Sequence, residues 1–351
     1  MRDVAIVSFG QSKHVRAQTN ANEVEMLMPV VRGVLDDVGI GMDRVGFTCS
    51  GSTDYLSGQA FSFVMTLDAV GPWPPISESH VEMDGAWAMY EAWVKLQMGD
   101  IDVALIYAYS KSSPGNLPEV LTRQLDPYSV APLWPDSIAL AGLQTRALLD
   151  SGRAKESDLA HVAARSRRDA LANPYALLAR DDDADALLSE PYLAEPMHKW
   201  DCPPITDGAA AMVIAADDAA RELCARPAWI RGIDHRVEPQ GFGLRDLTRS
   251  VSTATAAQKA GVANAPVDLA EIHAPFTAQE LILRDAIGLG DGVTINPSGG
   301  ALSANPMMAA GLIRLGEAAT RISQGAANRA VAHATSGPLL QQNLVCVLEG
   351  E

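Results

Sequence analysis

"NPSGGALSANPMMAAG", residues 296–311, joins an Asn-Pro-Ser-Gly-Gly turn to an apolar, helix-forming run. Pro297 fixes one backbone angle, and the two glycines that follow permit conformations closed to other residues. Asn305 and Pro306 stand just beyond this turn, directly before the apolar run. The stretch therefore predicts a tight functional loop that leads into a helix.

The length and composition of the chain indicate a large folded protein. With 351 residues, of which 48% are hydrophobic, the chain can form two to three domains or one large duplicated domain. It contains no apolar run of about 18 residues, so we expect no membrane span. The opening "MRDVAIVSFGQSKH" enters a strand-like run without a secretory leader, which predicts a cytoplasmic protein.

Charge and cysteine usage narrow the choice of partners. The net charge of −16 argues against nucleic acid as a partner. A local basic patch, "ARSRRDALANPY" at 164–175, could still bind an anionic, nucleotide-bearing cofactor. The four cysteines are scattered without a Cys-x-x-Cys pair, so neither a disulfide framework nor a structural zinc site is predicted.

Short apolar runs alternate with helical runs, which favours an α/β architecture. The predicted elements of the first hundred residues are strands over 4–9, 45–51 and 102–109 and helices over 22–39 and 84–100. The same order returns near the C-terminus, over 254–276 and 311–337.

Three landmarks repeat at a nearly constant offset. Gly39 and Gly261 are 222 residues apart, Asp43 and Asp268 are 225 apart, and Gly99 and Gly325 are 226 apart. This spacing predicts duplication of a βαβ-rich half, although helix–Gly–strand patterns also recur by chance in α/β proteins.

An insertion separates the two predicted halves. Residues 112–205 are Pro-rich at first, helical later, and acidic at 180–191, where a solvated face is the simplest interpretation. Excursions from a rigid scaffold often carry ligand contacts. The predicted divisions are an N-terminal half, an inserted loop domain, a returning strand and helix, and a C-terminal half, at 1–111, 112–205, 206–225 and 226–351.

Four segments together resemble the thiolase superfamily. The quoted stretch 296–311 resembles the thiolase motif in which Asn-Pro-x-Gly-Gly precedes Gly-His-Pro, and "CPPITDGAAAMVIA" at 202–215 resembles the segment that re-enters the N-terminal half. "EIHAPFTAQEL" at 271–281 resembles the His-Asp-Cys-Phe segment of sterol-carrier-protein-type thiolases. "AVAHATSG" at 330–337 stands where many thiolases have Cys-x-Gly and some sterol-carrier types a His.

The resemblance covers nearly the whole chain and is strongest to actinobacterial lipid-transfer-protein thiolases, some of which act on steroid side-chain acyl-CoAs. It implies a duplicated five-layer αβαβα fold with an inserted loop domain. The helices over 84–100 and 307–323 would be the two buried between the sheets. Proteins of this fold are generally dimers or tetramers, so the resemblance also implies an oligomer.

The family's nucleophilic cysteine has no counterpart where the resemblance implies it. Counting back from Asp102 places that position near Glu82, and no cysteine occurs between residues 50 and 201. A carboxylate cannot take and release an acyl group as a thiolate does, so thiolysis through a cysteine is not expected. Asp84, nearby, could assist chemistry or simply cap the helix over 84–100.

Other family positions also differ. Asn305 replaces the His of His-Pro, where it could form an oxyanion contact or cap the next helix. Pro275 replaces the cysteine of the sterol-carrier motif, whereas His273 remains. His333 stands where a general base is expected. Each histidine could be structural, but together they predict an acid/base set.

These residues favour retro-aldol cleavage of a β-hydroxyacyl-CoA over thiolysis. Lyases of this kind in the family work with a zinc-ribbon/OB-fold subunit, although the tyrosines associated with them are missing from 271–281 and 296–311. Alternatives are a catalytically degenerate subunit paired with an active thiolase-like chain, and an acyl-CoA or lipid carrier. We expect coenzyme A as part of the substrate rather than a tightly bound cofactor, with contacts from Gly299, Gly300 and the arginines of the basic patch, Arg165, Arg167 and Arg168.

Overall fold

The computed structural model describes residues 1–351, and ten strands form its central sheet. Five belong to the N-terminal half, in the order β3-β2-β4-β7-β1. Their bounds are β1 Val4–Gln11, β2 Phe47–Gly51, β3 Glu78–Val81, β4 Val103–Ser110 and β7 Gly208–Ala216. Inside this half, β3, β2 and β4 are parallel to one another, and β7 is antiparallel to both β4 and β1.

The C-terminal half repeats this arrangement strand for strand. Its order is β10-β9-β11-β12-β8, with β10, β9 and β11 parallel and β12 antiparallel to both neighbours. The bounds are β8 Ala228–Val237, β9 Leu269–Ile272, β10 Thr294–Ile295, β11 Arg329–Ser336 and β12 Gln342–Glu349. β1 and β8 join the halves through two short register pairs, Ala5 with Trp229 and Ile6 with Ala228. The same order and direction in both halves support the predicted duplication.

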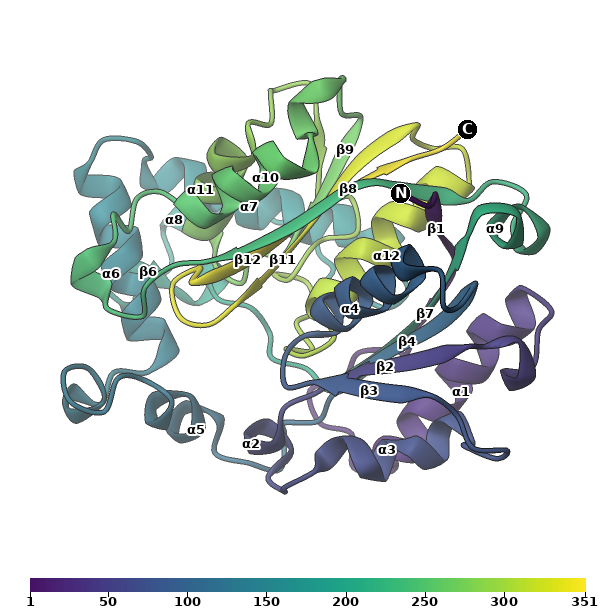
Figure 1. Ribbon diagram of the computed structural model, residues 1–351. Coiled ribbons are helices and arrows are strands. Elements are labelled where there is room, and N and C mark those ends of the chain that lie inside the picture. Colours follow the sequence, from purple (N-terminus) through teal and green to yellow (C-terminus); the bar gives the residue numbers. More distant parts are fainter.

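Helices lie between the two half-sheets and outside each of them. α4 (Gly85–Met98) and α12 (Ala310–Ser323) occupy the middle, as Figure 1 shows, and pack with the inner faces of both half-sheets in one core of 35 buried residues. α1 (Glu23–Asp37), α3 (Ser62–Val70) and α9 (Asp217–Leu223) cover the outer face of the N-terminal half. α10 (Val251–Ala260) and α11 (Thr277–Ile287) cover that of the C-terminal half. These are the five layers of the predicted thiolase-like fold.

The predicted elements are confirmed with small differences at their ends. The helix expected over 22–39 is α1, which begins after a capping box formed by Asn22 and Glu25 and buries residues spaced three and four apart. The helix expected from residue 307 begins later, at Ala310, because residues 306–309 form a turn closed by a bond from the Ala309 N–H to the Pro306 carbonyl.

The central helices approach each other so closely that side chains are excluded at their starts. A Cβ added to Gly311 of α12 would lie 2.5 Å from both the Ala334 Cβ and the Asp84 Oδ1. A Cβ added to Gly85 of α4 would lie 2.6 Å from the Ala108 Cβ. Glycine is therefore required at both positions to let the helices and strands meet.

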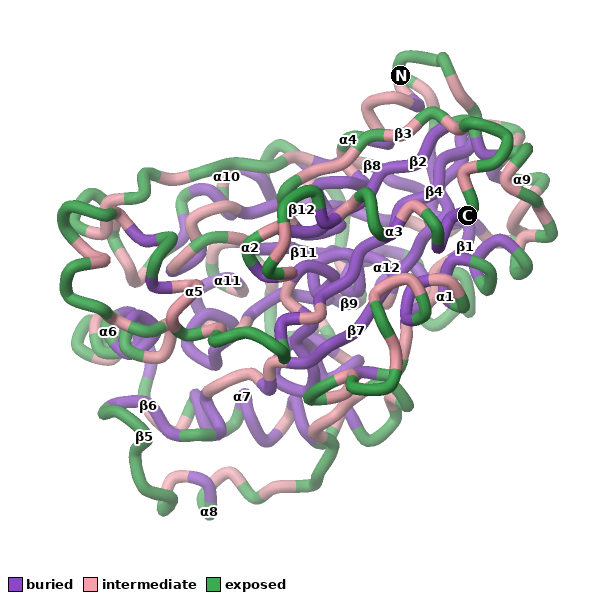
Figure 2. The backbone as a smooth tube through the Cα atoms, turned by 90° about the horizontal axis from the view of Figure 1, so that it is seen from below, coloured by how far each residue is buried: buried purple, intermediate pink, exposed green.

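The chain between β4 and β7 forms the inserted region. It contains α5 (Leu117–Arg123), α6 (Ser137–Asp150), α7 (Glu156–Asp169), α8 (Ala184–Leu188) and the hairpin β5–β6 (Tyr192–Ala194 and Met197–His198); the remaining short helix, α2 (Asp54–Ser57), follows β2. Figure 2 shows that buried segments concentrate along the sheet and α12, whereas the segments around α5 and β5 are mostly exposed. α6 and α7 nevertheless pack against α11, so this region closes one end of the C-terminal half.

Candidate active site

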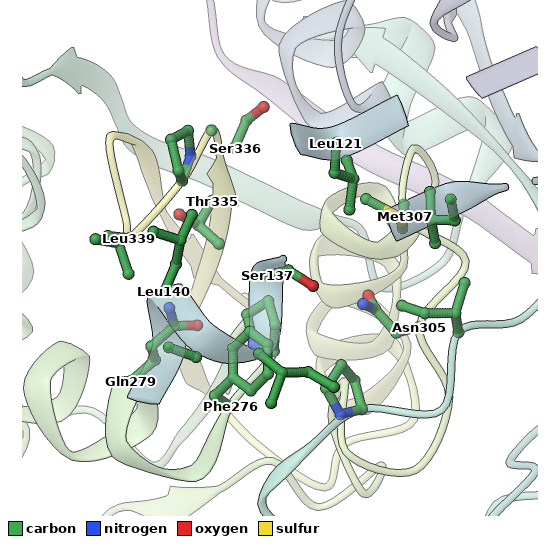
Figure 3. Close-up of a pocket in the computed structure, with 18 of the residues that line it drawn as sticks. Leu121, Ser137, Leu140, Phe276, Gln279, Asn305, Met307, Thr335, Ser336 and Leu339 are labelled. Carbon is green, nitrogen blue, oxygen red and sulfur yellow. The ribbon is translucent and has the colours of Figure 1, made fainter. Parts of the chain in front are cut away.

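A cavity of about 340 Å³ lies between the inserted region and the C-terminal half. Its wall comes from α5, α6 and residues 202–205 on one side, and from residues 273–279, 305–308 and 335–340 on the other. Figure 3 shows Leu121, Leu140, Phe276, Met307 and Leu339 converging on it from these segments. A cavity of this size, mostly apolar with a few polar groups, is the usual form of a site for a small organic ligand.

Three titratable side chains line the cavity, namely Tyr55, Cys202 and His273, and no carboxylate does. Burial raises the pKa of the Cys202 thiol to about 12, so the sulfur is protonated at neutral pH. Its Sγ donates to the His198 carbonyl oxygen at 3.6 Å. The cavity therefore offers no thiolate, and the imidazole of His273 is its most suitable group for proton transfer.

His273 and Asn305 form a hydrogen-bonded pair in the cavity wall. His273 follows β9, and its Nε2 lies 3.2 Å from the Asn305 Oδ1. The backbone N–H of Thr335 donates to the His273 Nδ1 at 3.5 Å, so this nitrogen is unprotonated and the proton resides on Nε2. Burial, with smaller contributions from the charges of His333 and Arg314, lowers the pKa of His273 to about 3. The ring is thus neutral at physiological pH.

This tautomer fixes the amide of Asn305. Because Nε2 donates, the Asn305 oxygen must face the histidine and its Nδ2 must face away. Nδ2 donates to no protein group, and Asn305 lines the cavity. Asn305 does not cap the following helix, which begins five residues later at Ala310. The pair therefore presents an amide N–H donor to whatever occupies the cavity.

Asp84 stabilises the starts of both central helices. Its Oδ1 accepts from the N–H groups of Ala86 at 2.8 Å and Leu312 at 3.0 Å, and its Oδ2 accepts from that of Gly311 at 2.7 Å. Burial raises the pKa of Asp84 to about 7, and the three donors oppose this rise. One carboxylate thus caps α4 and α12 together, which explains why α12 lacks a side-chain cap from its own Ala309.

The start of α4 lies directly behind the cavity wall without opening into it. The Gly85 N–H donates to the carbonyl of Met308, a lining residue, at 2.9 Å. Trp87 and Met83, two large side chains at the start of α4 that a blocked site would contain, do not line the cavity and therefore do not fill it. Glu82 is exposed and points elsewhere, since its Oε1 accepts from the Asp54 N–H at 2.5 Å.

The backbones of His333 and His273 lie side by side, but the His333 ring faces another layer of the fold. The His273 N–H donates to the His333 carbonyl at 3.1 Å. The His333 ring, however, is fully buried and outside the cavity lining, with Nε2 3.0 Å from the Asn343 Oδ1. Burial lowers its pKa to about 4. Of the five residues predicted as catalytic, the cavity wall brings together His273 and Asn305.

The arginines predicted for coenzyme A lie on α7, away from the cavity lining. Arg165 donates to both oxygens of Glu280 and to the Ile295 carbonyl, and Arg167 pairs with Asp182 at 2.7 Å. Arg168 has only a 4.0 Å contact with Asp169 and is exposed. Gly299 and Gly300 are buried with positive φ, and the Gly299 carbonyl accepts from Ser166 of the same helix.

Two residues of interest were missed in the sequence. Gln279 lines the cavity from the first turn of α11. Arg245 donates to the carbonyls of Pro338 and Leu339 in the cavity wall, and burial lowers its pKa. No short motif contains Arg245, whereas Gln279 belongs to the family-like segment "EIHAPFTAQEL" at 271–281, in which only His273 and Pro275 were considered. That segment, with its helix start after "HAPF" at 273–276, was the signal that could have pointed to Gln279.

Comparison with known proteins gives relatives over almost the whole chain. The acetyl-CoA acetyltransferase of Methanothermobacter thermautotrophicus is 24% identical over 96% of this chain and 95% of that protein. Human sterol carrier protein 2 is 23% identical over 98% of this chain and 70% of that protein. Benzoylsuccinyl-CoA thiolase subunit BbsB of Thauera aromatica is 27% identical over 48% of this chain and 50% of that protein. No family model matches the chain.

Solved structures give the same fold. The Ltp2-ChsH2(DUF35) aldolase has a TM-score of 0.79 at 18% identity, covering 99% of this chain and 97% of the matched chain. Human mitochondrial 3-ketoacyl-CoA thiolase also has a TM-score of 0.79, at 15% identity, covering 99% of this chain and 98% of that one. None of the helices combines the length and apolar character needed to cross a bilayer.

Proposed function

Because the homologues of this chain are thiolases and the thiolase-like sterol carrier protein 2, we propose that it cleaves a carbon–carbon bond of a β-hydroxyacyl-CoA by a retro-aldol reaction, without a cysteine nucleophile. The observation that carries the proposal is the His273–Asn305 pair, 3.2 Å apart in the wall of a mostly apolar cavity. The start of α4 supports a reaction without a nucleophile there. Asp84, the residue before this helix, is already committed to three backbone N–H donors.

Asn305 would act on the thioester. A carbonyl oxygen placed against its Nδ2 gains a fixed hydrogen bond, which strengthens as negative charge develops on that oxygen. His273 keeps the amide in this orientation through its Nε2–H. In a site shielded from water, such a donor is already oriented before the reaction begins.

The reaction itself balances without a co-substrate. A base takes the proton of the β-hydroxyl group, the Cα–Cβ bond breaks, and Cβ becomes the carbonyl carbon of a released aldehyde or ketone. The electron pair moves onto the thioester oxygen as an enolate, which then takes a proton at Cα to give a shortened acyl-CoA.

His273 is our candidate for the base. Its neutral Nδ1 holds only the 3.5 Å bond from Thr335, the longest of its contacts, and this bond can yield to a substrate hydroxyl. A buried imidazolium is unfavourable in this mostly apolar cavity, as the His273 pKa of about 3 reflects. The enolate that forms beside it supplies the missing negative charge, so proton transfer becomes easier as the bond breaks.

The name of one structural neighbour supports this reaction class. The Ltp2-ChsH2(DUF35) aldolase shares the fold, and its name joins two components, Ltp2 and ChsH2(DUF35). For the present chain we propose a lipid or steroid side-chain acyl-CoA as the substrate and a zinc-ribbon/OB-fold subunit as a partner. Coenzyme A would enter as part of the substrate and not as a resident cofactor.

Product analysis by mass spectrometry tests the proposal. The purified protein would be mixed with matched β-hydroxyacyl-CoAs and β-ketoacyl-CoAs, the latter with free coenzyme A. We expect a shortened acyl-CoA together with an aldehyde or ketone from the β-hydroxy compounds alone, and no loss of activity after thiol alkylation. Cleavage of the β-keto compounds that is abolished by alkylation would contradict the proposal.

A second function, a non-catalytic subunit beside an active thiolase-like chain, is supported by an exposed apolar surface. Phe61 and Trp73 are 69% and 85% exposed at either end of α3, and Val64 and Met65 are half-exposed along it. The edge strand β3 lies beside this helix. Light scattering would give the mass of the assembly, and a protein that stays inactive alone but forms a complex of defined mass with an active chain would favour this function.

A further inference from the structure

Gln279 is a buried amide whose orientation is fixed by a relay of hydrogen bonds. The Leu247 carbonyl accepts from the Gln144 Nε2 at 3.1 Å, and the Gln144 Oε1 accepts from the Gln279 Nε2 at 3.0 Å. Because a carbonyl oxygen can only accept, Gln144 must turn its nitrogen to Leu247 and its oxygen to Gln279. The nitrogen of Gln279 is then committed as well, and its oxygen must point away from Gln144.

That oxygen has no partner in the protein. Gln279 is 4% exposed, and its Oε1 is buried without a hydrogen bond. Gln279 lines the cavity, and Figure 3 shows its amide oxygen turned toward the space enclosed by Phe276 and Leu140. Leaving a buried acceptor unsatisfied costs about 1–3 kcal/mol, so such groups are rare outside binding sites.

The group that satisfies this oxygen must bring a donor. The apolar side chains of Phe276 and Leu140, which lie on this side of Gln279 in Figure 3, offer none. A carbonyl or carboxylate in the ligand would face the oxygen with another acceptor and would be repelled. A hydroxyl group has the required O–H, and it adds no charge to the apolar cavity.

We infer that the Gln279 Oε1 accepts a hydrogen bond from a hydroxyl group on the bound acyl chain, so that this cavity selects hydroxyacyl over unsubstituted and oxo-acyl ligands. This inference rests on the proposed function for the acyl-CoA nature of the ligand and for the position of the hydroxyl at C3. Because a hydroxyl group has a single hydrogen to donate, its O–H points to Gln279 in the bound complex and rotates about the C–O bond toward His273 for proton transfer. Gln279 is then a specificity-determining residue, and Gln144 is a positioning residue that holds its amide from outside the cavity lining.

Calorimetric binding to the intact chain tests this inference apart from turnover. The probes are three acyl-CoAs of one chain length, unsubstituted, 3-hydroxy and 3-oxo, titrated into the wild type and into Gln279→Met. We expect the wild type to bind the 3-hydroxy compound about tenfold or more tightly than the other two, since a satisfied acceptor replaces an unsatisfied one. In Gln279→Met the three affinities should become equal within about threefold.

A matched control and a second variant complete the design. Gln124 lines the same cavity, is exposed, and has no such relay, so Gln124→Met should keep the hydroxyl preference. Gln144→Met leaves the cavity lining intact and should lower the preference for the 3-hydroxy compound, because it frees the Gln279 amide. This variant serves as the test if Gln279→Met does not fold. A wild type without preference, or a preference that survives in both Gln279→Met and Gln144→Met, overturns the inference. Failure of all three acyl-CoAs to bind overturns the proposed function instead.

Discussion

The two halves of the molecule share one strand order but connect their equivalent elements differently. In the N-terminal half, β3 reaches α4 through residues 82–84 alone. In the C-terminal half, β10 reaches α12 through residues 296–309, the stretch that contains the Asn-Pro-Ser-Gly-Gly turn and Asn305. The short connection holds two helices through Asp84, whereas the long one places an amide in the cavity wall.

The cavity lining shows the same division. The C-terminal half supplies residues from three of its loops, and the inserted region supplies the facing wall. From residues 1–111 only Tyr55 takes part. A duplicated scaffold thus allows one copy to keep loops that bind a ligand while the other is restricted to packing. Substitutions in the N-terminal connection should then affect stability, and those in the C-terminal connection should affect activity.

The largest expected effect is on stability and concerns Asp84→Ala. The substitution leaves three buried N–H groups at two helix starts without an acceptor, which we expect to cost about 3–6 kcal/mol. The control is Asp136→Ala, which removes an exposed cap of α6 with one accepted bond and should cost about 1 kcal/mol. Guanidinium unfolding of both variants measures the difference. Equal losses would mean that Asp84 is an ordinary cap.

The next effect is on activity and concerns Asn305→Ala. Removing the cavity's fixed amide donor should lower kcat for cleavage about 10²–10³-fold. The free energy of unfolding should fall by about 1–3 kcal/mol, because the buried His273 Nε2–H loses its acceptor. The fold should survive, because the backbone bonds of residue 305 to Pro204 and Thr206 do not involve its side chain. Glu82→Gln is the matched change in the N-terminal connection and should leave kcat within about twofold, since Glu82 faces Asp54 outside the cavity. Steady-state kinetics on one β-hydroxyacyl-CoA gives kcat for both variants. A larger loss of kcat in Glu82→Gln than in Asn305→Ala would place the chemistry in the N-terminal connection.

The fold could be predicted from the sequence, whereas the geometry of the site could be predicted only in part. The duplication, the elements and the fold could be predicted, because helix and strand periodicity and the Gly and Asp landmarks repeat in both halves. His273 and Asn305 could be proposed from motif positions. Their pairing could not, because it depends on a tautomer that is set by the Thr335 N–H from β11.

Other parts of the site lay beyond local patterns. The second helix held by Asp84 starts 226 residues later in the chain, at Ala310, and no cap motif spans such a distance. The relay from Leu247 through Gln144 to Gln279 joins three separate segments. The side on which the His333 ring lies could not be predicted either. A strand places alternate residues on opposite faces, and only the folded structure shows which face the cavity adjoins.

The pH dependence of activity should be flat where an ordinary histidine would titrate. The folded-state pKa of His273 is lowered to about 3, so the ring stays neutral and able to accept a proton from pH 5 to 8. A base with the ordinary pKa of 6.5 would lose activity about tenfold between pH 7.5 and 5.5, whereas we expect less than twofold. An activity profile with an inflection near pH 7 would point to Asp84, whose pKa is raised to about 7, and would bring the N-terminal half into the chemistry.

The smallest effect is expected in the inserted region, at Arg168. Arg165 and Arg167 are engaged with carboxylates, so Arg168 is the member of the basic patch most available to a phosphate of coenzyme A. Because it is exposed, Arg168→Ala should weaken acyl-CoA binding only about two- to threefold, and the difference should shrink as salt is added. Arg44→Ala, an exposed arginine of the N-terminal half that pairs with Glu222, is the control and should leave binding unchanged. Binding titrations at low and high salt measure both effects. If both variants bound like the wild type, the phosphates of coenzyme A would lie elsewhere, with Arg245 as the next candidate.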